Sequence, residues 1–171
     1  MNIAQVIDVF RKYEQLGKSA FNQIGGQQFH WQPDPESNSI AIIIRHLHGN
    51  MLSRWTDFLS SDGEKTGRNR DNEFERTQLE KDELVRLWDQ GWRVLFSTLE
   101  SLTEEDLNKT ILIRGEKHLV SEALLRQVAH YAYHVGQIVF IAKMILKDRW
   151  NTLSIKKGES DQFNQSMFLK A

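Results

Sequence analysis

The 171-residue sequence contains no cysteine, and this absence excludes disulfides, thiolate metal ligands and a cysteine nucleophile. Any metal would have to be held by histidine and by carboxylate or amide oxygens, which points to Zn, Ni, Fe or Mn rather than to a soft-thiolate site. Proline is also scarce, with two residues, and no repeat or low-complexity segment stands out. The length fits one domain with a sizeable core, and we take residues 1–171 as that domain.

The sequence also lacks an excess of charge of either sign. Its formal net charge is −1, so no overall basic field would attract nucleic acid. The N-terminal stretch MNIAQVIDVFRKYEQ becomes charged too early for a signal peptide, and no apolar run reaches the length of a membrane span. We therefore expect a soluble, cytoplasmic protein with no nucleic-acid partner and no membrane partner.

Apolar residues recur at helical spacing in four long segments. Together with a stretch at residues 110–120 that is typical of a small hairpin, they predict an all-α fold. The expected architecture is a four-helix up-down bundle with one long connection and a small β-hairpin before the last long helix. The four segments are Ile3 to Ile24, a helix capped by Asn38 or Ser39 and ending near Leu59, a helix capped by Thr77 with Glu80 and ending near Leu99, and Ser121 to Leu146.

The long connection, residues 61–76, is polar and dense in charges of both signs. Its length is typical of either a functional flap or a mobile loop. Arg68 and Arg70 could bind an anionic substrate, but Asp71, Glu73 and Glu75 follow them directly. We therefore interpret the segment as a self-paired, solvated loop. The tail beyond Leu146 is expected to be non-helical before residue 158.

Two histidines lie on the apolar face of the segment from Ser121 to Leu146. His130 and His134 are four residues apart and stack on one side of a helix, which is a metal-ligand spacing. The glutamate of HExxH sites is missing between them, which argues against a zincin peptidase. Gln127 lies on the same face and Gln137 at its edge, so the four polar side chains form a line along the helix. The alternative is that each histidine only donates a hydrogen bond to a neighbouring helix.

A third ligand could come from the helix that ends near Leu59. His46 and His48 lie on opposite borders of its apolar stripe, and periodicity does not choose between them, although it places His48 slightly nearer the centre. Asn50 and Arg54 follow His46 at successive turns. By itself, the row formed by His46, Asn50 and Arg54 is typical of a partly solvated helix edge.

The segments AIIIRHLHGNMLSRW and LLRQVAHYAYHVGQIVF together resemble the DinB-like superfamily of four-helix metal proteins. More narrowly, FLSSDGEKTGRNRDNEF, IRGEKH, AHYAYHVGQI and WNTLSIKKGES look like a bacterial branch described only as DinB-family or domain-of-unknown-function proteins. The resemblance spans nearly the whole chain, and its most specific part is the HxxxHxGQ element from His130 to Gln137.

The resemblance implies a divalent metal ion held by His46, His130 and His134, with His46 chosen because it occupies the "HL" position of the family. Zn or Ni is expected first, and Fe or Mn as alternatives. Better-understood relatives are S-transferases that use bacillithiol or mycothiol, and a thiol-dependent maleylpyruvate isomerase. The expected partner is therefore a small-molecule substrate, with a low-molecular-weight thiol among the candidates.

Three functions are compatible with these residues. The first is a metal-dependent thiol S-transferase or hydrolase, in which Asn50, Arg54 and Gln137 orient a metal ligand or the substrate. No carboxylate is clearly placed as a general base, which weakens the hydrolase version, and the sequence assigns no catalytic residue. The second is a non-enzymatic stress protein that binds a metal or small ligand. The third is a metal-free structural bundle that forms a homodimer, and a homodimer is expected for the enzyme as well.

Overall fold

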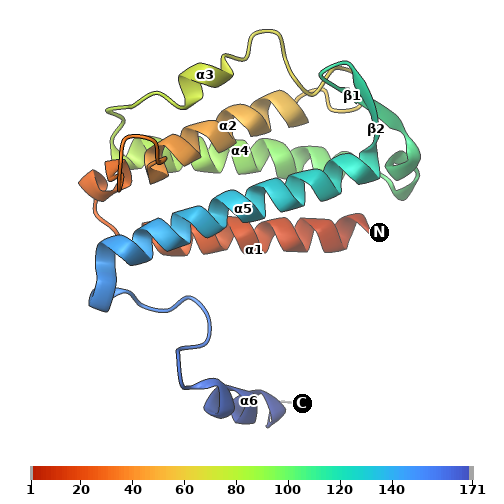
Figure 1. The fold of residues 1–171 in the computed structure, drawn as a ribbon. Coiled ribbons are helices and arrows are strands. Elements are labelled where there is room, and N and C mark those ends of the chain that lie inside the picture. Colours follow the sequence, from red (N-terminus) through yellow and green to blue (C-terminus); the bar gives the residue numbers. More distant parts are fainter. Residues whose placement is uncertain (1, 170–171) are drawn as a thin grey trace.

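The computed structural model of the protein describes residues 2–169, and four long helices make up most of it (Figure 1). Helix α2 packs along α4 and α1 packs along α5, and further contacts join α2 to α5 and α1 to α4. This arrangement confirms the predicted all-α bundle. The long helices are α1 (Ile3–Phe21), α2 (Ile40–Trp55), α4 (Lys81–Ser101) and α5 (Val120–Leu146).

Shorter elements connect the long helices. Two of them, α3 and the hairpin β1–β2, lie at the site described below. The shorter elements are the 3₁₀ helix η1 (Gly26–His30), α3 (Arg70–Glu73), η2 (Glu104–Asn108), β1 (Thr110–Ile113), β2 (Glu116–Leu119), η3 (Lys147–Arg149) and α6 (Ser160–Phe168).

The long connection between α2 and α4, residues 56–80, carries the chain back along α2 (Figure 1). Near its start, the Gly63 amide donates to the Leu112 carbonyl of β1 over 2.8 Å. Near its end, the Arg45 guanidinium of α2 donates to the Asn72 carbonyl over 2.7 Å. Helix α4 therefore begins at the same end of the bundle as α2 and runs parallel to it, so the four helices run up, down, down and up.

The helix starts are set by side chains that satisfy free backbone N–H groups. At α2 the Ser39 hydroxyl accepts from the Ile42 amide over 3.2 Å, which confirms one of the two predicted caps. Helix α4 begins later than predicted. Its N-cap is Glu80, whose amide donates to the Glu83 carboxylate over 2.9 Å, so the predicted capping box at Thr77 is wrong.

The predicted hairpin is present and is tied to the long connection. The turn residues Arg114 and Gly115 have φ angles of 56° and 77°, the left-handed region that two-residue hairpin loops require. Their two amides donate to the Asp62 carboxylate over 2.8 and 2.7 Å. Strand β2 leads straight into α5, where the Leu119 amide donates to the Glu122 carboxylate. The N-cap is thus Leu119, not the predicted Ser121.

The core of the bundle is rich in aromatic side chains. Phe10, Trp55, Trp92 and Tyr131 are fully buried and meet edge to face or tilted, at centroid separations of 5.6–6.4 Å. A buried hydrogen-bond chain leads out of this cluster, because Trp55 Nε1 donates to the Tyr131 hydroxyl, which donates to Asn50 Oδ1, each over 2.9 Å. The chain connects the core to the polar side of α2.

The C-terminal part of the described chain leaves the bundle. Trp150 and Leu153 still pack against the core, whereas α6 lies away from the four long helices and its residues are exposed (Figure 1). Helix α6 begins after residue 158, as expected for the tail. None of the helices within residues 2–169 is both long enough and apolar enough to cross a membrane.

Close packing between α1 and α4 depends on a glycine. A Cβ atom at Gly17 would lie 2.5 Å from Cζ2 of the buried Trp88, whereas a Cβ at the exposed helical Gly136 would meet nothing within 4 Å. We expect Gly17→Ala to lower the free energy of unfolding by about 1–3 kcal/mol through overpacking. Gly136→Ala should raise it by about 0.5–1 kcal/mol. Urea unfolding measures both, and equal effects would contradict the packing argument.

Candidate metal centre

The structure brings three histidines together between α2 and α5. His46 comes from α2, and His130 and His134 come from successive turns of α5, with possible ligand atoms that all lie within 4.8 Å of one another. The Nε2 atoms of His46 and His130 are 3.2 Å apart. His46 and His134 are buried and His130 is half-buried. These are the three residues that the resemblance selected.

His48 points elsewhere. Its Nε2 lies 3.1 Å from Oε1 of Gln90, a residue of α4 on the other side of α2. Helix α2 is packed between α4 and α5, so its buried stripe is bordered by two different neighbours. This is why periodicity alone could not separate His46 from His48.

The two histidines of α5 are oriented by glutamines of the same helix. His130 Nδ1 lies 3.3 Å from Gln127 Oε1, and His134 Nδ1 lies 2.8 Å from Gln137 Oε1. An amide oxygen can only accept a hydrogen bond, so in both rings the proton is on Nδ1. Gln137 was predicted to orient a metal ligand or the substrate; the contact is present, and the role stays a prediction. Gln127, which the sequence placed on the same face, was not assigned and makes the matching contact at the i, i−3 position.

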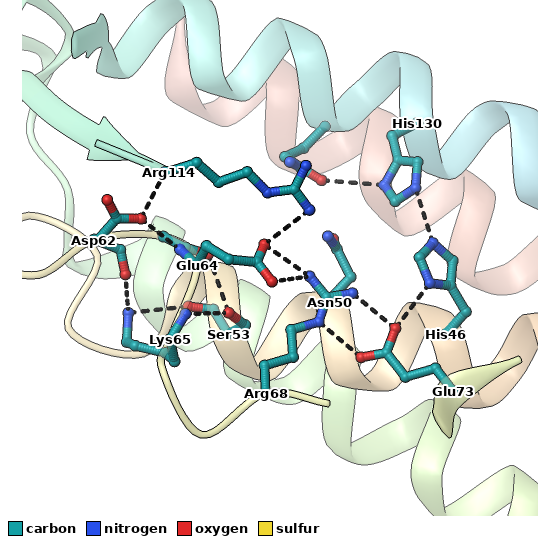
Figure 2. Close-up of polar contacts among 12 residues, drawn as sticks. His46, Asn50, Ser53, Asp62, Glu64, Lys65, Arg68, Glu73, Arg114 and His130 are labelled. Atoms are coloured by element: carbon teal, nitrogen blue, oxygen red, sulfur yellow. Dashed lines mark hydrogen bonds and ion pairs between the residues drawn. The ribbon is translucent and has the colours of Figure 1, made fainter. Parts of the chain in front are cut away.

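A carboxylate orients the third histidine (Figure 2). His46 Nδ1 donates to Glu73 Oε2 over 2.9 Å, and both oxygens of Glu73 accept from Arg68, whose Nε and Nη2 lie 2.7 and 2.8 Å away. Burial by itself would raise the pKa of Glu73, but the hydrogen bonds from Arg68 and His46 hold it below its ordinary value. Glu73 is therefore ionised and fixes the Nδ1 proton of His46.

All three imidazoles thus carry their proton on the outer nitrogen. Their Nε2 atoms are left for the centre of the cluster, where those of His46 and His130 lie 3.2 Å apart. Histidine ligands of metals are oriented in this way, with the second ring nitrogen donating to a carboxylate or carbonyl oxygen. The residues present fit a divalent ion.

Burial keeps the two histidines of α5 neutral. It lowers the pKa of His130 to about 3, helped by the proximity of His134 and His46. It lowers the pKa of His134 to about 4, and here too His46 contributes. A neutral imidazole is the form that binds a metal, so the histidines need not lose a proton at neutral pH.

Most residues of the long connection are exposed or half-buried, as expected for a solvated loop, but part of it covers the site. It is self-paired as predicted, through Glu64, Arg68 and Glu73, but the Arg68 and Glu73 side chains are only 5% and 10% exposed. Gly49 of α2 permits this, because a Cβ atom there would collide with the Glu73 carboxylate. Glu73 was missed as a functional residue, since a polar segment without periodicity gives no signal of what it packs against.

The histidines open onto a cavity of about 410 Å³ between α2, α5, the connection and the hairpin. Asn50 and Arg54 line it, on the same side of α2 as His46. All three are at most 6% exposed, so the interpretation of this row as a partly solvated helix edge is wrong. Asn50 contacts the core through Tyr131, and the cavity is large enough for a small molecule.

A family model described as "Protein of unknown function (DUF1572)" matches residues 2–159. The chain belongs to this family. It is also similar in structure to a solved protein, the conserved protein of locus from Enterococcus faecalis, with a TM-score of 0.64. The sequences are 14% identical over 85% of this chain and 98% of the other, so the likeness shows the fold alone.

No curated protein sequence is similar enough to count as a match. The family match agrees with the narrower resemblance to domain-of-unknown-function proteins. The wider relation to the DinB-like superfamily stays a prediction.

The arrangement of the histidines predicts different outcomes for the two residues on α2. We expect His46→Ala to lose bound metal, as we expect for His134→Ala, because each removes one of three converging Nε2 atoms. His48→Ala should keep metal near the wild-type level, since its side chain faces Gln90. Elemental analysis of the purified variants measures this, and equal losses at His46 and His48 would show that the assignment is wrong.

Glu73 offers a test of how the ligands are oriented. Glu73→Gln keeps an oxygen for His46 but removes the charge paired with Arg68, so we expect metal affinity to fall about 10- to 100-fold. Glu75→Gln, at an exposed position of the same connection, is the control and should have no effect. Competition with a chromophoric chelator gives both dissociation constants. Unchanged affinity in Glu73→Gln would contradict the role of this carboxylate.

Proposed function

We propose that the protein is a divalent-metal-dependent enzyme that transfers a thiol to an electrophilic substrate, with His46, His130 and His134 as the metal ligands. The observation that supports this most is the convergence of three Nε2 atoms on one wall of a cavity. Three protein ligands leave coordination positions for a substrate, which is typical of catalytic rather than structural sites. The donor set suits Zn or Ni, with Fe or Mn as alternatives.

When bound, such an ion supplies a Lewis acid that makes a thiol or a water molecule more acidic at neutral pH. The chain supplies orientation. Glu73 and the two glutamines hold the imidazoles, and residues of the connection and the hairpin line the cavity. Asn50 and Arg54 line the cavity and are placed to contact the substrate.

The carboxylates near the cavity favour thiol transfer over hydrolysis. Within the described part of the chain, Glu64 lines the cavity and is paired with Arg68 and Arg114, while Glu73 is paired with Arg68 and His46. Neither is free to take a proton from water. A thiol has an ordinary pKa near 8.5, so it needs much less help to ionise than water does.

The same lack of a free base is what favours the alternative, a non-enzymatic protein that binds a metal or a small ligand. A metal-free structural bundle is the third function. Homodimer formation stays a prediction, for which the exposed Tyr133 and Phe140 of α5 offer an apolar face, and light scattering would test it. A cytoplasmic location also stays a prediction.

Metal loading gives the first test. At a concentration 100 times its Kd, a metal that binds only the folded state adds about 2.7 kcal/mol of stability. For a chain of this length we expect the melting temperature to rise by about 5–10 °C. Differential scanning calorimetry of untagged, chelator-stripped protein with and without added Zn²⁺ or Ni²⁺ measures the shift. No shift of the melting temperature with either metal would count against the site.

Catalysis needs a second test. The loaded protein is incubated with bacillithiol or mycothiol and a chromogenic electrophile, and we expect thiol consumption that stops on addition of chelator and is absent in His134→Ala. Metal binding without turnover of any thiol would favour the non-enzymatic alternative. Turnover that survives both the chelator and the substitution would contradict the proposed role of the metal.

A further inference from the structure

Arg54 is a buried cation that forms no ion pair within residues 2–169. Its side chain belongs to a residue that is only 3% exposed, and its Nε and Nη1 atoms are buried without a hydrogen-bond partner among residues 2–169. Arg68, which lines the same cavity, also has a buried side chain, 5% exposed, but it is matched by Glu73 and Glu64. Natural proteins rarely leave buried polar atoms unpaired, and such atoms are a reason to look for a ligand.

The energetic cost of this arrangement is high. Taking a charged group out of water is unfavourable by several kcal/mol unless an opposite charge or hydrogen bonds compensate for it. Burial lowers the pKa of Arg54, and the proximity of Arg126 and Arg68 also lowers it, while Tyr131 and Glu64 act in the opposite direction. Arginine nevertheless stays protonated in proteins, so the positive charge remains. An anionic group bound next to Arg54 would compensate for the unfavourable free energy of burying its charge.

Most of the other charged side chains that line the cavity are also positive. Four further arginines line it, and the one carboxylate in the lining, Glu64, is already shared between Arg68 and Arg114. Arg126 of α5 is exposed at the edge of the cavity, and neither it nor Arg54 forms an ion pair within the described residues. The lining arginines are Arg54, Arg68, Arg70, Arg114 and Arg126.

The position of Arg54 relative to the histidines limits the size of the ligand. Arg54 follows His46 by two turns on the same side of α2, a rise of about 12 Å along the helix axis. Asn50 lies between them, and all three side chains line one cavity. A small molecule with an anionic group at one end can therefore reach Arg54 while its other end faces the histidines.

We propose that the cavity binds the anionic group, a carboxylate or a phosphate, of a small substrate at Arg54, with Arg126 at the entrance and the reactive end of the substrate toward the three histidines. This inference gives the chemical class of the substrate. It rests on the proposed function only in treating the bound molecule as a substrate. The anion site itself needs only the residues of this chain.

The test uses Arg54→Met in the full-length, chelator-stripped protein. Methionine fills much of the same space without the charge, so in the absence of anions the variant should melt about 2–4 °C above the wild type. Inorganic phosphate and malonate are the probes, and metal is removed because both can coordinate a divalent ion. One or both should stabilise the wild type, and the affinity should fall about 10- to 100-fold or more in Arg54→Met.

The control is Arg70→Met, which removes the same charge from an exposed position in the lining of the same cavity. It should weaken anion binding about twofold or less. Binding of malonate alone assigns a carboxylate, binding of phosphate alone assigns a phosphate, and binding of both assigns the shared charge. Three results would overturn the proposal: no binding of either probe to the wild type, unchanged binding in Arg54→Met, or equal losses in the two variants.

The two proposals can fail separately. Anion binding to the stripped protein that depends on Arg54, together with no uptake of Zn²⁺ or Ni²⁺, would retain the anion site and remove the metal enzyme. Metal uptake without anion binding would retain the metal enzyme and remove the anion site.

Discussion

The carboxylate of Glu73 is the contact on which the site depends. It accepts from His46 on one side and from Arg68 on the other, so it attaches the connection between α2 and α4 to the face of α2 that carries the histidine. Removing one partner of such a buried network leaves the other uncompensated, which costs more than the intact network contributes. Gly49 gives the carboxylate room, at a helix position where alanine would otherwise be more stable.

Two buried arginines in the same cavity differ in how they are satisfied. Arg68 is matched by Glu73 and Glu64 and serves to position His46 through the carboxylate. Arg54 has no such partner within residues 2–169, although it is only 3% exposed. Residues that break the rules of a stable core are expected where a protein binds something, because the ligand completes the interactions that the chain leaves open.

Much of the bundle follows from local pattern. The apolar repeat predicted four helices, and the i, i+4 spacing of His130 and His134 predicted that they share a spot on α5. The glutamines at i, i−3 and i, i+3 from these histidines belong to the same local pattern. The helix starts were less well predicted. The N-caps are Glu80 and Leu119 rather than Thr77 and Ser121, and the amide of each donates to the carboxylate of a downstream glutamate.

By itself, the sequence determined the helices and the histidine pair, because both depend on residues within one or two turns of each other. The family resemblance chose His46 over His48, but only the tertiary structure gave the physical reason. It also decided that Arg54 is buried and that Glu73 lies against the site. Those outcomes depend on which segments pack on which side of α2. The contacts that settle them join His46 to residues 27 and 84 positions away in the chain, and no local spacing carries that information.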